Sequence, residues 1–309
     1  MAIGLKRVVG ALAGMVVGAA GFAGAAMADE LADLPVLSSD HGVLDVVMVA
    51  RSQPIHRFGT PTPKGWVFSV CARTAPDQQD CPTSPDNLYG GTRLQVQPGD
   101  TLKIRLVNHL PPVTDSEWAR VPHHQWLSLN PVNLHTHGML VSPRAPTVAD
   151  PTYGDNVFVM TLNPENGPLP VGSMIHSDVK TGFTDYRIHV PASHPPGLYW
   201  FHPHIHGISV NQMSAGMSGV ITVGDVSDYV SGIEGLPIRH IMLKDSQVAA
   251  DGHLIDEEQA VFCPPAPHPA EPVWQGSCPG AKEGKGGRWF FTLNGQPYPT
   301  ATIGSQGEI

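Results

Sequence analysis

Glycine and proline are the residues that most restrict how this chain can fold. The 309 residues include 33 glycines and 31 prolines, and 41% of the chain is hydrophobic. Proline removes a backbone donor and glycine raises the entropy cost of ordering, so both disfavour long helices. The hydrophobic content is sufficient for a sizeable core. The sequence therefore predicts many short strands joined by turns and argues against a helical bundle.

Short alternating or β-branched runs recur along the chain, and turn residues separate them. This pattern is typical of an antiparallel β-sandwich or barrel. The Pro98-Gly99 pair is the clearest turn, and we expect it to reverse the chain between two strands. We expect strands over residues 43–49, 66–70, 93–97, 101–107, 157–162, 186–190, 198–201 and 219–223.

The pattern changes near Gly224-Asp225, where we expect one domain to end. We predict a complete β domain over residues 29–225 and the beginning of a second β domain over residues 226–309. A new strand is expected over residues 238–243, and a loop rich in proline, glycine and charge over residues 264–287.

The end of the sequence resembles an interrupted strand–turn–strand unit. The run 288–293 and the turn Asn294-Gly295 repeat the order of features seen at 94–104, but the second strand does not follow. We therefore expect the sequence to be an incomplete chain.

The first 28 residues have the features of an export signal. Lys6-Arg7 precede an apolar stretch over residues 8–23, and Ala26-Met27-Ala28 supplies a small-x-small cleavage pattern. A membrane anchor is the alternative, although the stretch is short for the ~20 apolar residues that a span requires. We predict a periplasmic or secreted protein with no membrane span after cleavage at residue 28.

Four cysteines are consistent with an exported protein. Cys71 and Cys81 lie in one loop, and Cys263 and Cys278 lie in another. Two local disulfides are the simplest pairing in an oxidising compartment, and four free thiols are the alternative. Neither pair has the Cys-x-x-Cys spacing of a zinc or redox site.

The charge balance argues against nucleic acid as a partner. Lysine and arginine total 18 against 27 acidic residues, giving a net charge of −9, and there is no basic tract. The 16 histidines are a high count and suggest a metal.

Two segments carry paired histidines, namely His135-Thr-His137-Gly138 and Trp200-Phe-His202-Pro-His204. In a strand, residues i and i+2 point to the same face, about 6.6–7 Å apart. Each pair can therefore offer two imidazoles to one metal or to two neighbouring metals, and imidazole suits copper and zinc. His206 continues the alternation, but Pro203 disturbs the strand, so we place His206 outside the ligand set.

These motifs resemble those of the multicopper oxidases, the family of laccases, cuprous oxidases and bilirubin oxidases. The turn segment that begins at Gln97 and the strand ending at Asn108 also match, as does the stretch 212–221, which is similar to the end of the family's first domain. The resemblance covers roughly residues 40–309. It implies all-β, cupredoxin-like Greek-key sandwich domains.

The resemblance also implies a function and a set of ligands. His135 would bind the type 2 copper, and His137, His202 and His204 would bind the type 3 pair of a trinuclear copper cluster. The enzyme would couple one-electron oxidation of a small-molecule or metal-ion reductant to four-electron reduction of dioxygen to water. In the family the other half of the cluster and the type 1 copper belong to the last domain, and no cysteine here has a histidine beside it. We therefore expect a C-terminal domain outside this sequence.

Oxygen reduction also needs protons, and a carboxylate near the cluster can relay them. Asp155 is our candidate, and Asp150 is its rival.

Two other functions fit the same histidines. A mononuclear zinc hydrolase is one alternative, although no aspartate adjoins the second motif. A non-enzymatic copper-binding scaffold with a cupredoxin-like fold is the other.

Overall fold

The computed structural model describes residues 29–59, 62–83, 88–113, 122–248, 254–255, 288–305 and 307–308. The expected export signal at 1–28, the Cys263–Cys278 pair and the loop at 264–287 lie outside these residues. Most of the regular secondary structure in the described part is strand. That part contains no helix long and apolar enough to cross a bilayer.

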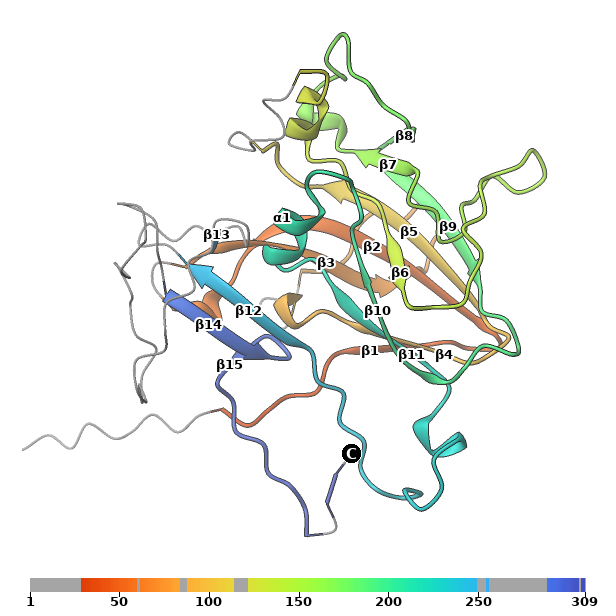
Figure 1. Cartoon of the computed structure of the whole chain (residues 1–309), viewed down its shortest axis with the longest axis vertical. Helices are drawn as coiled ribbons and strands as arrows, with labels where there is room; N and C mark the ends of the chain where they lie inside the picture. The colour runs from red at the N-terminus through yellow and green to blue at the C-terminus, as the bar shows by residue number, and fades with distance from the viewer. Residues whose placement is uncertain are drawn as a thin grey trace, which may run out of the picture.

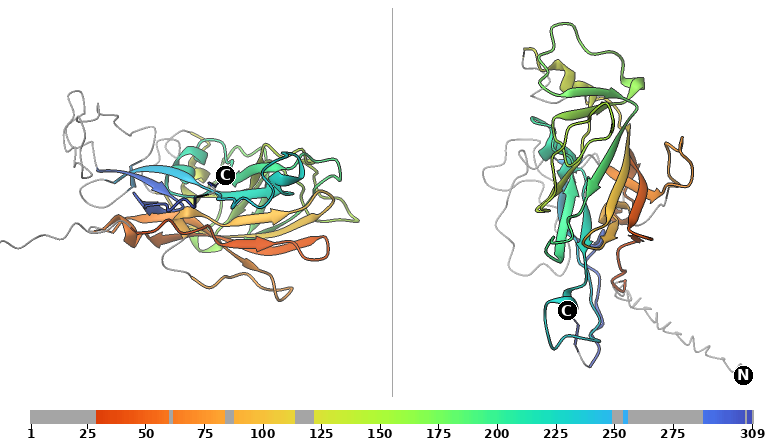
Figure 2. Two further views of the ribbon diagram at one scale, coloured as in Figure 1. Left: turned by 90° about the horizontal axis from the view of Figure 1, so that it is seen from below. Right: turned by 90° about the vertical axis from the view of Figure 1, so that its right-hand side faces the viewer.

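Two sheets pack face to face, as Figures 1 and 2 show. We call the first the site sheet; its strand order is β1 (Val36–Ser38), β4 (Arg93–Val96), β11 (Gly219–Val223), β10 (Gly197–His202) and β6 (His135–His137). We call the second the back sheet; its order is β3 (Lys64–Ala72), β2 (Val43–Pro54), β5 (Thr101–His109) and β9 (Phe183–His189). The predicted all-β, cupredoxin-like sandwich is confirmed.

Smaller elements complete the sandwich. β7 (Val159–Leu162) and β8 (Asp178–Thr181) form a separate parallel pair next to β9 in Figure 1. The one α-helix of the described residues is α1 (Ser209–Ser214), which follows β10. Single 3-10 turns lie at His56–Phe58, Leu88–Gly90, Gln125–Leu129, Pro164–Asn166 and Val226–Asp228.

The main core lies between the two sheets. Alternate residues of β2 and β5, among them Val46, Met48 and Ile104, are buried there, and strands of the site sheet contribute Leu94 and Ile221 from the other side. The alternation follows from the two-residue period of a strand. The opposite face of each strand is therefore free for other roles, and on the site sheet it carries the histidines.

Both sheets also contain parallel pairs, which the pattern of strands and turns did not predict. β2 pairs in parallel with β5, and β4 pairs in parallel with β11. The turn at Pro98-Gly99 forms as predicted, with Gly99 at φ 96° and a 3.0 Å hydrogen bond from Asp100 N to Gln97 O. It joins β4 to β5, which belong to different sheets, so the chain changes layer there and neighbouring strands in a sheet come from distant segments.

The strand expected over residues 238–243 begins only at its last residue, as β12 (Leu243–Val248). The Asn294 side chain accepts from Met242 N at 2.8 Å and donates to His240 O at 3.1 Å. These backbone groups are therefore satisfied by a side chain and do not need a neighbouring strand. β12 pairs with β13 (Leu254–Ile255) and β14 (Arg288–Leu293), and β14 pairs with β15 (Gln296–Pro297).

This second small sheet shares a core cluster with the sandwich. Phe58 of the sandwich stacks on Phe290 of β14 with ring centroids 4.4 Å apart, and Val67 and Val248 belong to the same buried cluster. The boundary predicted at residue 225 stays a prediction.

Lys244 is a partly buried cation at this junction. Its Nζ donates to the carbonyls of Tyr89 at 2.7 Å and Gly216 at 2.8 Å, and it lies 5.2 Å from the centroid of the Tyr89 ring. Burial lowers the pKa of the Lys244 amino group from 10.5 to about 7.

This lowered pKa predicts a specific pH dependence of stability. Between pH of about 7 and 10.5 the unfolded chain binds more protons at Lys244 than the folded chain, so the free energy of unfolding should rise with pH across that window. In the folded chain the buried Tyr89, whose pKa is raised to about 12, stays protonated over this window, and in the unfolded chain it begins to lose its proton only as the pH approaches about 10. Lys244→Met should reduce the rise between pH 7 and 9.5 in urea unfolding, whereas the exposed Lys64→Met should not. Equal slopes in wild type and Lys244→Met would contradict the assignment.

Cys71 and Cys81 form a disulfide, as predicted for this pair. The bond closes the loop that follows β3, and Cys81 packs against Val47 and Val49 on the outer side of the back sheet.

Removal of this disulfide should destabilise the chain. On the loop-entropy model, a loop of this size is worth about 3 kcal/mol. The double variant Cys71→Ser/Cys81→Ser should therefore lower both the thermal midpoint and the free energy of unfolding, measured by circular dichroism. An unchanged midpoint, or two reactive thiols at these positions in the native wild type, would show that the bond does not form.

Candidate metal centre

Backbone pairing brings the two histidine segments together. β6 and β10 run antiparallel, and their register places Trp200 opposite His137 and His202 opposite His135. Strand alternation turns Thr136 into the interior and leaves both flanking histidines on the outer face of the site sheet.

Three histidines meet closely enough to share a metal. Nitrogens of His135, His137 and His202 all lie within 4.8 Å of one another. The His204 ring adjoins them, with its centroid 5.2 Å from that of His135 and 5.8 Å from that of His202. The structure thus brings all four predicted ligands to one place, although their role as ligands stays a prediction.

His202 is the buried member of the group. Its Nδ1 lies 2.8 Å from the carbonyl of Pro203 and donates to it, so the lone pair is on Nε2. Burial, followed by repulsion from the neighbouring histidines, lowers the pKa of His202 to about 4. The ring is therefore neutral near pH 7, which is the form that binds a metal.

The spacing of two nitrogens fits a shared ion. His202 Nε2 lies 3.2 Å from His137 Nδ1. Two imidazole nitrogens bound to one tetrahedral ion at ~2.0 Å stand about 3.3 Å apart. The donor set present in the chain, all imidazole, therefore suits copper or zinc, and the His137–His202 pair already has the spacing of two nitrogens on one ion.

Asp155 orients His135. Its carboxylate lies 3.1 Å from His135 Nδ1 and accepts from the backbone N of Thr136 at 2.8 Å. The side chain of Asp155 is only 10% exposed. A carboxylate that accepts from one ring nitrogen leaves the other, here Nε2, available to a metal.

Asp150, the rival candidate, has other partners. It forms an ion pair with Arg144 at 3.2 Å and accepts from the Thr152 hydroxyl at 2.6 Å. None of its contacts within the described residues is with a histidine of the group.

Two supporting residues were not identified from the sequence. Asn133 Oδ1 accepts from His204 N at 2.6 Å, which joins the second motif to the segment just before β6. Trp200 stacks on His137 and on His202, with centroids 4.9 and 4.2 Å away. The signal was available for Trp200, which lies two positions before His202 in β10 and so shares its strand face, but not for Asn133, which precedes β6.

A glycine follows each histidine segment. Gly138 and Gly207 adopt positive φ values of 84° and 94°, which favour glycine and let the backbone turn away. His206 is exposed and lies outside the group of three.

No family model matches this sequence, and no match is found among curated proteins. Among solved structures, the chain is similar to a multicopper oxidase from Campylobacter jejuni, described as a metallo-oxidase. The TM-score is 0.51 at 16% identity, over 91% of this chain and 42% of that one. It is also similar to a variant of the McoA multicopper oxidase of Aquifex aeolicus (TM-score 0.47, 16% identity, 88% and 42% covered). A third similar structure is a laccase from Pediococcus acidilactici (0.45, 13%, 88% and 42%).

The first of these structures shows that this chain has the fold of the multicopper oxidases, as its motifs predicted. The chain spans 42% of the length of these structures.

The carboxylate beside His135 gives a prediction. Asp155→Asn removes the negative charge that lies 3.1 Å from His135 Nδ1, and loss of such a partner typically costs 10–100-fold in metal affinity. Copper affinity, measured by competition with a chelator, should fall within that range. Asp150→Asn is the matched control and should stay within twofold of wild type. Equal affinities for both variants would remove Asp155 from the site.

Proposed function

We propose that this chain supplies the N-terminal half of the trinuclear copper cluster of a multicopper oxidase. The whole enzyme would couple one-electron oxidation of a reductant to four-electron reduction of dioxygen to water. The observation that carries the proposal is the convergence of two His-x-His pairs from adjacent strands, with a carboxylate on the outer nitrogen of His135. The fold shared with multicopper oxidases supports it.

Within the cluster, His135 would bind the type 2 copper, and His137, His202 and His204 the type 3 pair. The 3.2 Å separation of His137 Nδ1 and His202 Nε2 supports placing these two nitrogens on the same type 3 ion. Copper ions held together in this way would let electrons be delivered to dioxygen without release of superoxide.

The residues of the chain hold the candidate ligands in position and keep His202 neutral. The Pro203 carbonyl sets the tautomer of His202, and Trp200 covers one face of its ring. Asp155 holds His135 and is our candidate to relay protons, because it is a nearly buried carboxylate in contact with a ligand.

The other half of the cluster would come from a C-terminal domain. His137 and His204 are exposed on the outer face of the site sheet, so the group is open on that side. Both cysteines of the described residues are joined in a disulfide and do not offer a thiolate for type 1 copper. Turnover would therefore require the C-terminal domain and a small-molecule or metal-ion reductant.

We place the protein in the periplasm or outside the cell. The disulfide between Cys71 and Cys81 supports an oxidising compartment.

A copper-binding scaffold is the second candidate, because the described residues would supply only half of a cluster. A zinc hydrolase is less favoured, since the group of three contains only histidines and the nearest carboxylate, Asp155, faces the outer nitrogen of His135.

The ligand assignment predicts the behaviour of one variant. His137→Ala should weaken copper binding by the chain at least tenfold, because one of the paired nitrogens is lost. Isothermal titration with copper measures the loss. His189→Ala, at an exposed histidine of β9, is the matched control and should bind like wild type.

Unchanged copper binding by His137→Ala would overturn the metal centre itself. Oxygen consumption by the chain combined with its C-terminal domain separates the two candidates. Consumption that His137→Ala abolishes supports the oxidase, whereas copper binding without consumption supports the scaffold.

A further inference from the structure

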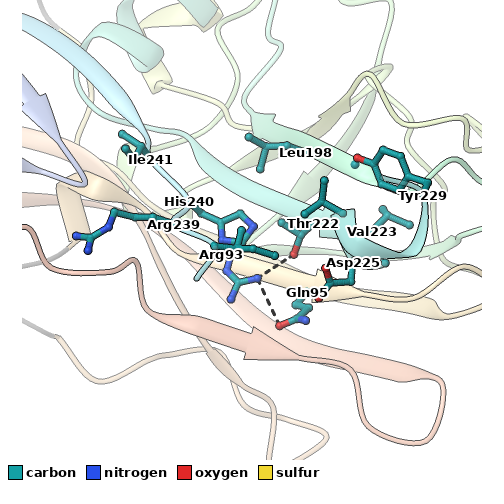
Figure 3. Close-up of a pocket in the computed structure, with 14 residues that line it drawn as sticks. Arg93, Gln95, Leu198, Thr222, Val223, Asp225, Tyr229, Arg239, His240 and Ile241 are labelled. Atoms are coloured by element: carbon teal, nitrogen blue, oxygen red, sulfur yellow. Dashed lines mark hydrogen bonds between the residues drawn. The ribbon is translucent and has the colours of Figure 1, made fainter. Parts of the chain in front are cut away.

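A cleft of about 210 Å³ lies on the outer face of the site sheet, and none of the four candidate metal ligands lines it. Its floor is formed by β4 and β11, and its wall by residues 238–241, the segment that joins the sandwich to β12. Figure 3 shows Arg93 at its centre, with the His240 ring beside it.

Arg93 is half-buried and keeps one side of its guanidinium unused. Nη1 donates to Thr222 Oγ1 at 3.2 Å and to Gln95 Oε1 at 3.4 Å, and both acceptors are neutral. Nε and Nη2 have no hydrogen-bond acceptor, and no carboxylate lies within ion-pair distance, among the residues that the structure describes. This free edge is the one that binds a carboxylate through two parallel hydrogen bonds.

Arg93 and the neighbouring His240 are both partly buried, and together they form the polar part of the cleft. Burial lowers the pKa of Arg93, and burial followed by repulsion from Arg93 lowers the pKa of His240. The ring nitrogens of His240 likewise have no hydrogen-bond partner among the described residues. A neutral His240 offers one further N–H donor beside the free edge of Arg93.

The remaining charged side chains at the cleft, Arg239 and Asp225, already have hydrogen-bond or ion-pair partners. Arg239 forms a two-point ion pair with Glu308, at 3.0 Å for each bond, and extends away from the cleft in Figure 3. Asp225 is exposed and accepts from the backbone and hydroxyl of Ser227, each at 2.9 Å. The two carboxylates that act on Arg93 electrostatically, Asp33 and Asp225, would repel a second negative charge on a ligand.

Apolar side chains border the cationic floor. Leu198, Tyr229 and Ile241 line the cleft and are 60%, 52% and 43% exposed. A ligand that covered them would remove apolar surface from water.

We propose that this cleft binds a small monocarboxylate with an apolar body. Its carboxylate pairs with Nε and Nη2 of Arg93 and accepts from His240, and its apolar part lies against Leu198, Tyr229 and Ile241. A dianion such as phosphate fits less well, because of Asp33 and Asp225. The site is independent of the copper proposal.

The test is calorimetric titration of the full chain, freed of metal with a chelator, with benzoate at low ionic strength. Benzoate should bind saturably at one site, and both benzyl alcohol and inorganic phosphate should bind at least tenfold more weakly. Arg93→Gln should weaken benzoate binding at least tenfold. Arg93→Lys, which keeps the charge but loses the planar edge, should weaken it at least threefold.

Arg239→Gln is the matched control at the same cleft and should bind benzoate within twofold of wild type, as should His137→Ala. Absence of saturable benzoate binding, equal binding of phosphate, or unchanged binding by both Arg93 variants would each overturn the proposal. The thermal midpoint of each variant verifies folding, and Arg93→Lys keeps the test decisive if Arg93→Gln does not fold.

Discussion

The register between β6 and β10 is the constraint on which the candidate site depends. Pairing of His202 with His135 and of Trp200 with His137 places three imidazoles on one face within reach of a common ion. A slip of one residue in β10 would turn its side chains to the opposite face, so that His202 would point into the core. The buried Phe201, packed between the sheets, opposes such a slip because it would then face outward.

Fixing the positions of the rings is only half of what the site requires, because a metal also needs lone pairs that point inward. The Pro203 carbonyl and the Asp155 carboxylate each take up one ring nitrogen, on His202 and His135 respectively. Burial keeps His202 neutral at the same time. The same surroundings therefore select the tautomer and the protonation state, and metal binding needs little reorganisation of the chain.

The sequence predicted what depends on neighbours along the chain and missed what depends on distant partners. Strand alternation and the family motifs placed the four histidines together correctly. The parallel pairing of β2 with β5 was not foreseen, because a turn such as Pro98-Gly99 does not reveal whether the next strand stays in the same sheet. The strand expected from residue 238 failed for a similar reason, since Asn294, more than fifty residues away, satisfies the backbone of Met242. The sequence alone did not show which of Asp155 and Asp150 contacts a histidine; in the structure Asp155 contacts His135.

Strand alternation also relates the two sites on the outer face. Arg93, Val220, Trp200 and His137 are aligned in one row across β4, β11, β10 and β6. Three steps of about 4.8 Å put the backbones of Arg93 and His137 roughly 14 Å apart. At that separation a carboxylate bound at Arg93 would contact none of the four histidines. Coupling between the two sites would act through the field of the bound charge or through movement of the strands, and the pairing of these four strands over the buried core resists such movement.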